Sequence, residues 1–299
     1  MRFAFALALL LLAMSAVAQH KSPQVNADHT VAFALNSPNA KKVTVGIEGR
    51  ASLDMVKGQD GWWTVTTPAL EPDIYGYTFS VDGVSFLDPQ NPQIKPNLLW
   101  LGNMVVVPGK QVWEVQDVPH GSLHRHHYKS ATIGDQRDFY VYTPPGYSPS
   151  NKKLPVLYLL HGFSDTANGW TSVGMAHVIL DNLIFQGKAK PMLVVMPLGY
   201  GVPDFASPGS ANFRNTQLVS RNYSNFSKAL LSEVMPMVEK EYRASPSSKD
   251  RAIAGLSMGG AETLFVGLNN VDKFTHVAAF STGGLGDLNT SFAGLVPDA

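Results

Sequence analysis

The stretch "RAIAGLSMGGAET", residues 251–263, decides how the second half of the chain is expected to fold. An apolar run leads into Gly255-Leu256-Ser257-Met258-Gly259, and small residues continue beyond it. This is the G-x-S-x-G pattern of a sharp turn between a strand and a helix, where only small residues two positions either side of the serine avoid collision. We therefore predict that Ser257 stands exposed at a helix N-terminus as a nucleophile. The alternative is an ordinary strand-to-helix turn.

A nucleophile of this kind needs donors for the oxyanion that forms when it attacks a carbonyl carbon. The backbone N–H of Met258, the residue after the nucleophile, is the first candidate. The run "LYLLHGF", residues 157–163, ends an earlier buried strand, and in the α/β-hydrolase arrangement the loop there supplies the second donor. We assign that donor to Phe163 and a structural role to His161, the alternative being a plain turn at a strand end.

From residue 126 onward, short continuous apolar runs alternate with helical segments, as expected for strands buried on both faces of a mostly parallel sheet. Helices are predicted at Met175–Phe185, which ends before Gly187, and at Phe226–Tyr242, which Pro236 should bend. The Gly- and Pro-rich loop 198–215 follows a predicted parallel strand. Such loops border the active site in open α/β sheets, so we expect substrate contacts there.

Residues 24–115 read as several short strands separated by turns, which predicts an all-β sandwich of immunoglobulin type. Asp82-Gly83 lies between two strand-like runs and predicts a hairpin. Residues 116–125 are predicted to be a linker. Tryptophans can stack on sugar rings, but packing in the core or between domains is the preferred interpretation for most of four residues: Trp62, Trp63, Trp100 and Trp113.

The motifs "VYTPPGY", "LPVLYLLHG", "DNLIFQGKAKPMLVVMPLGYG" and "RAIAGLSMGG" resemble the esterase family that holds feruloyl and acetyl-xylan esterases and enterochelin esterase-like proteins. "DIYGYTFSVDGV" and "LDPQNPQ" resemble the early-set immunoglobulin-like module that precedes such esterases. The resemblance covers residues 28–298 and implies a carboxylic-ester hydrolase acting on acylated carbohydrate or a related ester. Carried over by position, Ser257 matches the nucleophile, and Met258 and Phe163 match the oxyanion donors.

The catalytic acid and histidine of such a triad follow the serine in sequence. Of nine histidines only His276 does so, and it is expected at the end of its strand away from the nucleophile, in a structural role. Asp287 follows that strand but has no histidine to orient. We therefore expect residues 126–299 to be an α/β-hydrolase domain that is incomplete at its C-terminus, and this fragment to be inactive without the missing acid and histidine.

Residues 1–18 read as a signal peptide, with Arg2, an apolar stretch and the small residues Ala16 and Ala18. This predicts an exported protein, periplasmic or secreted, that does not stay in the membrane after the signal peptide is cleaved. The alternative is that this segment is an N-terminal membrane anchor. Lys+Arg and Asp+Glu both number 23, so no charge excess directs the chain to nucleic acid. Without cysteine, a thiol nucleophile and cysteine-ligated metal sites are excluded.

No cofactor and no metal is expected. The run of His124, His126 and His127 in "LHRHHY" fits no zinc spacing, so it is interpreted as a solvated or domain-packing cluster. The leading function is that of a serine esterase that forms an acyl-enzyme at Ser257. The alternatives are an acyltransferase that uses the same serine and a non-catalytic carbohydrate-binding or scaffold protein. The acyl group, the alcohol, the oligomeric state and whether the N-terminal domain binds sugar stay open.

Overall fold

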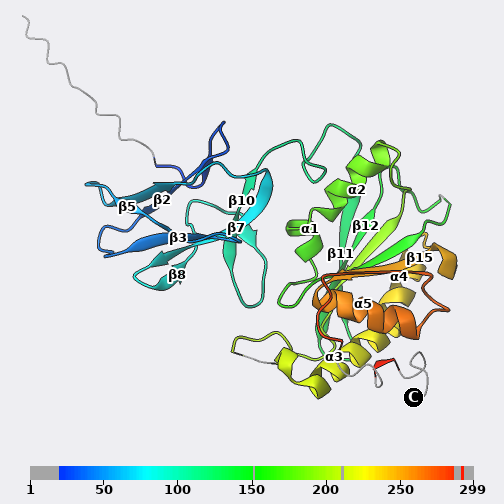
Figure 1. The fold of residues 1–299 in the computed structure, drawn as a ribbon. Helices are drawn as coiled ribbons and strands as arrows, with labels where there is room; N and C mark the ends of the chain where they lie inside the picture. Colours follow the sequence, from blue (N-terminus) through cyan, green and yellow to red (C-terminus); the bar gives the residue numbers. More distant parts are fainter. Residues whose placement is uncertain (1–19, 151, 210–211, 286–290, 293–299) are drawn as a thin grey trace, which may run out of the picture.

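Residues 20–150, 152–209, 212–285 and 291–292 are described by the structure, a computed structural model. The predicted signal peptide, residues 1–18, and Asp287 lie outside them. Figure 1 shows two small sheets from the N-terminal part of the chain beside a larger sheet built from the C-terminal part.

The N-terminal part consists of two sheets that enclose one core. The first has the order β1-β2-β6-β5 and contains β1 (Gln24–Val25), β2 (Val31–Asn36), β6 (Trp62–Thr66) and β5 (Val56–Lys57). The second has the order β4-β3-β7-β10-β9, with β4 (Leu53–Asp54), β3 (Val43–Ile47), β7 (Asp73–Val81), β10 (Gly102–Val107) and β9 (Ile94–Lys95). Phe33 of β2 packs on Tyr77 and Phe79 of β7, which joins the sheets face to face.

The predicted hairpin at Asp82-Gly83 is confirmed. β8 (Val84–Phe86) pairs with the end of β7, and both turn residues have positive φ angles, 49° and 89°. This backbone matches the twist of the flanking strands, and Asp and Gly are among the residues that tolerate it.

The C-terminal sheet is mixed, with the strand order β11-β12-β14-β13-β15-β16. Its strands are β11 (Ser122–Lys129), β12 (Gln136–Thr143), β14 (Leu193–Pro197), β13 (Val156–Leu160), β15 (Arg251–Leu256) and β16 (His276–Phe280). β13 runs parallel to β14 and β15, and β15 runs parallel to β16, whereas β12 is antiparallel to β11 and β14. The carboxyl ends of β13, β14 and β15 therefore meet at one edge.

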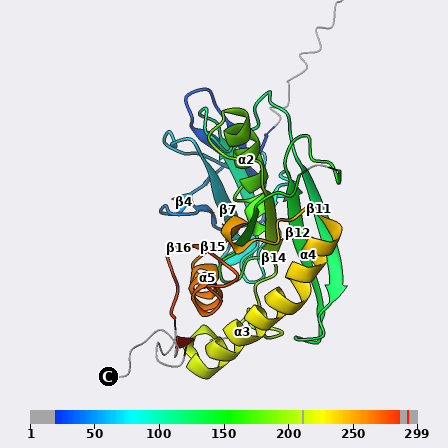
Figure 2. The ribbon, with the colours of Figure 1, turned by 90° about the vertical axis from the view of Figure 1, so that its right-hand side faces the viewer.

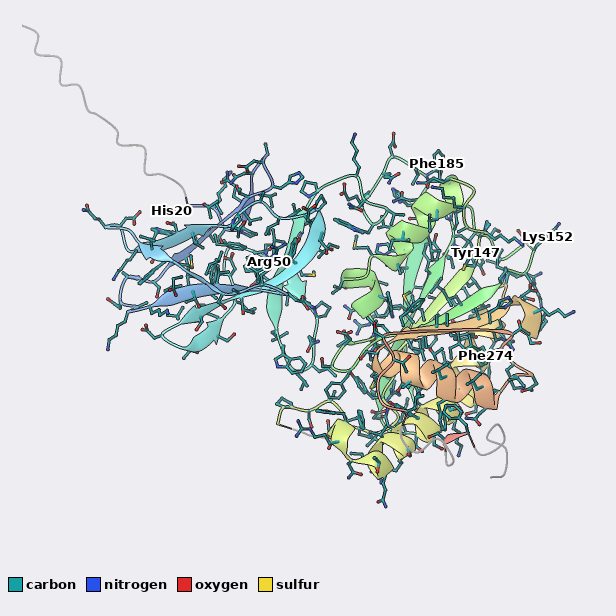
Figure 3. All side chains as sticks on the ribbon, viewed as in Figure 1. His20, Arg50, Tyr147, Lys152, Phe185 and Phe274 are labelled. Carbon is teal, nitrogen blue, oxygen red and sulfur yellow. The ribbon has the colours of Figure 1, made fainter. Side chains whose placement is uncertain are left out.

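Helices cover both faces of this sheet, as continuous apolar strands predict. α1 (Gly169–Ser172) and α2 (Ala176–Phe185) lie on one face, and α3 (Thr216–Ala229), α4 (Met235–Glu241) and α5 (Met258–Asn269) lie on the other (Figures 1 and 2). Figure 3 shows that side chains fill the space between sheet and helices, where buried Phe274 packs on Tyr158. No helix among the described residues has the length and hydrophobicity needed to cross a membrane.

The two helix predictions are confirmed in their main features. α2 begins after Met175 and ends at Phe185. The second predicted helix starts earlier than expected, at Thr216 instead of Phe226, and ends at Glu241. It is one continuous segment, in which a π-helical stretch, Leu230–Val234, joins α3 to α4. Pro236 follows directly, at the start of α4. A proline has no N–H to donate, and the wider helical turn before it accommodates that gap.

Part of the predicted linker is strand. β11 begins at Ser122, so the three-histidine cluster lies on an edge strand instead of a linker. The His126 ring stacks on Phe139 with 4.7 Å between centroids, and its Nε2 lies 2.6 Å from the Tyr242 hydroxyl. These contacts support packing, and no group of three metal-ligating side chains was found in the described part of the chain.

The segment before β11, residues 112–121, is fastened to α2 and is called the strap below. The Asn182 side chain donates to the carbonyls of Val112 and Glu114 at 2.8 and 2.9 Å. The buried Asp181 carboxylate accepts from the Gly121 N–H at 2.9 Å and contacts His120 Nδ1 at 3.0 Å. These hydrogen bonds hold the strap, which connects the N-terminal sheets to the mixed sheet, against α2.

Candidate active site

Ser257 lies in the turn that joins β15 to α5, at the carboxyl edge of the mixed sheet. Its backbone has φ 57° and ψ −115°. Residues other than glycine rarely adopt this conformation, which costs about 1–3 kcal/mol of conformational free energy. The Ser257 N–H donates to the Phe280 carbonyl, and the Ser257 carbonyl accepts from the Gly283 N–H, both at 2.9 Å. The surrounding chain thus holds the serine in place at the N-terminus of a twelve-residue helix.

The glycines of the motif are required by close backbone contacts. A Cβ on Gly259 would lie 2.5 Å from the His161 carbonyl oxygen and 2.6 Å from that of Leu160. A Cβ on Gly255 would collide with the Gly259 carbonyl. The first turn of α5 lies so close to the end of β13 that a side chain at either glycine would collide with backbone atoms. This confirms the prediction that G-x-S-x-G needs small residues two positions either side of the serine.

The loop after β13 brings Phe163 to the same place. A Cβ on Gly162 would lie 3.7 Å from the Ser257 Cβ, so the two turns are in contact. Neither the Phe163 N–H nor the Met258 N–H has an acceptor among the hydrogen bonds of the described residues. Two free N–H groups beside a serine can bind a negatively charged oxygen, and the dipole of α5 favours this.

A cavity of about 330 Å³ opens in front of Ser257 and is mainly apolar. Met258 and Phe163 line it together with four apolar or aromatic side chains: Phe205, Phe213, Val219 and Tyr223. Phe205 and Phe213 belong to the loop 198–215, so the loop borders this cavity at these two residues, and the substrate contacts expected there stay a prediction. The cavity is large enough for an aromatic ring and its ester group.

His161, next to this site, has both ring nitrogens occupied. Its Nδ1 lies 2.8 Å from the Gly162 carbonyl, to which it donates, and its Nε2 accepts from the Gly199 N–H at 2.9 Å. Complete burial lowers the pKa of His161, which favours the neutral ring. His161 thus joins the ends of β13 and β14, consistent with the structural role expected of it.

Glu262 on α5 is a buried acid close to the same loops. Its Oε1 accepts from the Asn222 side chain at 3.2 Å, and its Oε2 has no hydrogen-bond partner among the described residues. Burial raises the pKa of Glu262 well above its usual range, which favours the neutral carboxyl group. Asn222 Oδ1 also accepts from the N–H groups of Gly201 and Val202, so Asn222 connects α5 to the loop after β14.

His276, the histidine that follows Ser257 in sequence, is far from the site. It begins β16 and is paired with Ala252 at the start of β15, whereas Ser257 follows the other end of β15. Its predicted position at the opposite end of the sheet is confirmed. No histidine lines the cavity in front of Ser257 within the described ranges.

Trp100 was not singled out as a site residue by the sequence, yet it lines the same cavity. It comes from the segment between β9 and β10 of the N-terminal sheets, and 67% of its surface is exposed. The neighbouring Asn97 binds the loop after β13, where its side chain donates to Ser164 Oγ at 3.0 Å. The run "NLLWLG" carried no periodicity that could reveal this contact, because the contact depends on how two distant parts of the chain pack.

Comparison with known proteins assigns the chain to a class. Residues 130–285 match the family described as "Putative esterase", and the chain belongs to this esterase family. The resemblance of the C-terminal motifs to an esterase family is thereby confirmed.

Two individual relatives within the matches are bacterial xylanases, one of which is also described as a feruloyl esterase. The endo-1,4-beta-xylanase/feruloyl esterase of Xylanibacter ruminicola is 31% identical over 270 residues, which are 87% of this chain and 36% of that protein. Endo-1,4-beta-xylanase Y of Acetivibrio thermocellus is 30% identical over 160 residues, 50% of this chain and 13% of that protein. This chain thus spans little more than a third of the first relative's length and a smaller share of the second's.

Solved structures agree with the mixed-sheet fold. The ferulic acid esterase of Anaeromyces mucronatus, solved with ferulic acid, is similar with a TM-score of 0.52 and 27% identity, covering 58% of this chain and 63% of that one. The enterobactin esterase of Shigella flexneri, solved with 2,3-di-hydroxy-N-benzoyl-serine, has a TM-score of 0.61 at 18% identity, covering 82% of this chain and 68% of that one. At 18% identity, the similarity to the enterobactin esterase shows a shared fold only.

Proposed function

We propose that this protein is an exported serine carboxylic-ester hydrolase that acts on acylated carbohydrate through an acyl-enzyme at Ser257. The observation that carries the proposal is the strained Ser257 at the start of α5, with the unpaired N–H groups of Met258 and Phe163 beside it. This arrangement has the parts of a nucleophile elbow with its oxyanion hole. The feruloyl esterase relatives support the choice of substrate.

In the proposed reaction Ser257 Oγ attacks the ester carbonyl carbon and transfers its proton to a general base. The carbonyl oxygen becomes an oxyanion, which accepts hydrogen bonds from Met258 and Phe163. The C–O bond to the alcohol then breaks, and the alcohol leaves with the proton. Water attacks the acyl-enzyme in the second half of the reaction, which releases the acid and restores the hydroxyl of Ser257.

We extend the proposal to the domains and their folds. Residues 126–299 belong to an α/β-hydrolase domain, 24–115 to an immunoglobulin-like sandwich and 116–125 to the connection between them. Residues 1–18 act as the signal peptide for export. The parallel strands β13, β14, β15 and β16, with helices on both faces, support the hydrolase assignment. The shared core of the two N-terminal sheets supports the sandwich.

A serine-reactive fluorophosphonate tests the assignment of the nucleophile in the full-length natural protein. We expect the probe to label the protein once, and labelling to disappear in Ser257→Ala. Ser85→Ala is the matched control, because Ser85 lies in the exposed strand β8. Labelling that persists in Ser257→Ala would disprove the proposal, and a protein that is not labelled at all would favour the carbohydrate-binding alternative.

A further inference from the structure

Glu262 is a buried acid that the proposed reaction does not use. It lies in the first half of α5, the helix that begins after Ser257, and it is completely buried. Its Oε1 accepts a hydrogen bond from the Asn222 side chain at 3.2 Å, and its Oε2 has no partner among the described residues. Burying a carboxyl group with a single hydrogen bond is costly, because both the charge and the unpaired oxygen lose their contact with water. Unsatisfied polar groups of this kind are rare in folded proteins and are concentrated at functional sites.

Asn222 of α3 connects Glu262 to the loop after β14. Its Oδ1 accepts from the N–H groups of Gly201 and Val202 at 2.8 and 3.2 Å. Because Oδ1 is occupied in this way, the amide group turns its Nδ2 toward Glu262 and needs an acceptor there. A Cβ on Gly201 would collide with the Asn222 carbonyl, so the loop lies directly against α3. Glu262, Asn222 and this loop therefore form one connected unit.

The same loop packs on one of the two proposed oxyanion donors. The Phe205 N–H donates to the Val202 carbonyl at 3.3 Å, and the Phe205 ring meets the Phe163 ring edge to face with 6.0 Å between centroids. Phe163 carries one proposed donor N–H, and α5, which carries Glu262, begins with the other at Met258. The hydrogen bonds of Glu262 therefore join α5 to the loop that packs on Phe163, and they affect the distance between the two donors.

Titratable side chains from four other elements face Glu262. Burial lowers the pKa of His161, at the end of β13, and raises the pKa of Tyr200, after β14, and of Tyr223 on α3, so all three favour the neutral form. Arg137 of β12 is permanently charged and lowers the pKa of Glu262, but it is already engaged in an ion pair. Burial outweighs this attraction and favours the neutral carboxyl group. Ionisation at high pH would place a charge on Oε2, to which no described group donates.

We propose that Glu262 is a positioning residue, whose neutral carboxyl group acts through Asn222 to keep the loop after β14 and the two oxyanion donors in place beside Ser257. When the pH rises far enough to ionise Glu262, the carboxylate turns toward water, the loop is released and turnover falls. The inference rests on the proposed function for the role of the donors. The link between Glu262 and the loop depends only on the hydrogen bonds described above.

Glu262→Met and Glu262→Gln, made in the full-length natural protein, separate the effect of the hydrogen bond from that of the charge. Methionine fills a similar space but gives Asn222 no oxygen acceptor. We therefore expect kcat for a small aryl ester to fall by about tenfold with little change in KM, because the donors act on the transition state. Glutamine keeps the acceptor and carries no charge at any pH, so it should recover most of that loss. It should also keep its kcat at the alkaline pH at which the natural protein loses activity.

Glu233→Gln is the matched control. Glu233 also joins a helical segment to a loop, because it accepts from Ser130 Oγ and the Thr132 N–H, both at 2.7 Å, but that loop joins β11 to β12 at the other side of the sheet. Its replacement should leave kcat and the alkaline profile as in the natural protein. A Glu262→Met variant with natural kcat would overturn the inference. So would a Glu262→Gln variant that loses kcat at the same alkaline pH as the natural protein, and this result decides if Glu262→Met does not fold.

Hydrogen exchange tests the link to the loop without catalysis. The N–H groups of Gly201 and Val202 should exchange faster in Glu262→Met than in the natural protein at the same pH. At alkaline pH they should exchange faster in the natural protein than in Glu262→Gln. Equal exchange in all three proteins would overturn the inference. Failure of the proposed function would appear differently, as a natural protein that shows this exchange pattern but neither reacts with the serine probe nor hydrolyses esters.

Discussion

Ser257 has an unfavourable backbone conformation at the position where the proposed chemistry takes place. Hydrogen bonds to Phe280 and from Gly283 hold it there, and the packing of Gly259 on β13 leaves the chain no other path. Holding the hydroxyl group of Ser257 in this position therefore lowers the free energy of unfolding, and such strain is common at functional sites. The backbone strain of the serine and its proposed function can be measured separately.

Ser257→Gly should remove the strain and the nucleophile together. We expect the variant to be about 1 kcal/mol more stable than the natural protein, because glycine adopts positive φ angles freely. Ester hydrolysis should fall by about a thousandfold or more. Urea unfolding gives the stability, and Ser85→Gly in β8 is the control, in which glycine should destabilise an extended strand. A Ser257→Gly variant that loses as much stability as Ser85→Gly would show that the turn is not strained.

Glu262 should make the free energy of unfolding depend on pH. Its pKa is raised in the folded state, whereas an unfolded glutamate ionises above about pH 4.3. Above that pH the unfolded chain binds fewer protons than the folded one, so this group lowers the free energy of unfolding as the pH rises. Glu262→Gln removes the effect, and we expect the variant to gain stability relative to the natural protein between pH 5 and pH 8.

Thermal unfolding of both proteins at several pH values measures this difference. Glu71→Gln serves as the control for the loss of a carboxylate at the surface, because Glu71 is exposed. If the difference for Glu262→Gln varies with pH no more than the difference for Glu71→Gln, the buried carboxyl group does not hold its proton in the folded protein.

At the scale of elements, the turns at the ends of β13 and β15 form one unit. The carbonyls of Leu160 and His161 lie against the first turn of α5, and the free N–H groups of Phe163 and Met258 come from these two turns. Small changes in the distance between α5 and β13 should therefore affect both stability and the proposed oxyanion hole.

Gly259→Ala tests this contact. The added methyl group would lie 2.5 Å from the His161 carbonyl, so α5 must move away from β13. We expect a loss of about 2–3 kcal/mol in the free energy of unfolding, typical of overpacking against backbone. Gly284→Ala is the control, since a Cβ there meets nothing within 4 Å. Urea unfolding that gives equal stability for the two variants would contradict the close approach.

The elements that the sequence predicted well are those with a strong local signal. The elbow at Gly255–Gly259, the hairpin at Asp82-Gly83 and the helix that ends at Phe185 each depend on residues close together in the chain. The start of β11 was missed because "SLHRHHYK" is a polar edge strand with histidines on it, and it does not alternate as a buried strand does.

The candidate site was only half predictable for the same reason. Ser257, Phe163 and Met258 belong to motifs, whereas Trp100 reaches the site through packing between parts of the chain far apart in sequence. Nothing in a single sequence shows that Asn97 binds Ser164. The exposure of Trp100, which distinguishes it from the buried Trp63, is likewise a property of the fold.

At the scale of the whole molecule, the N-terminal sheets are attached to the mixed sheet in two places. The strap lies on α2 through Asp181 and Asn182, and the segment 97–100 lies on the loop after β13. Two separate attachments resist rotation better than one, so Trp100 keeps its position relative to Ser257.

Asp181→Ala should loosen the first attachment. Asp181 accepts hydrogen bonds from the Gly121 N–H and the Tyr142 hydroxyl and contacts His120, and its loss leaves buried groups unpaired. We expect a loss of about 3 kcal/mol in the free energy of unfolding and faster hydrogen exchange in the strap. Asp117→Ala, an exposed position in the same strap, should change neither. Unchanged exchange in Asp181→Ala would mean that the strap is held by its other contacts alone.

The strap also has a consequence for how such a protein can be rebuilt. A chimera that joins the N-terminal sheets of another protein to this mixed sheet at residue 122 would lack the carbonyls that Asn182 binds and the asparagine that grips Ser164. The grafted half would be covalently linked but not held in a fixed orientation, so none of its residues would be positioned at the cavity in front of Ser257 as Trp100 is. The N-terminal sheets and the mixed sheet should therefore be transferred together in a chimera, because their relative orientation depends on contacts specific to this pair.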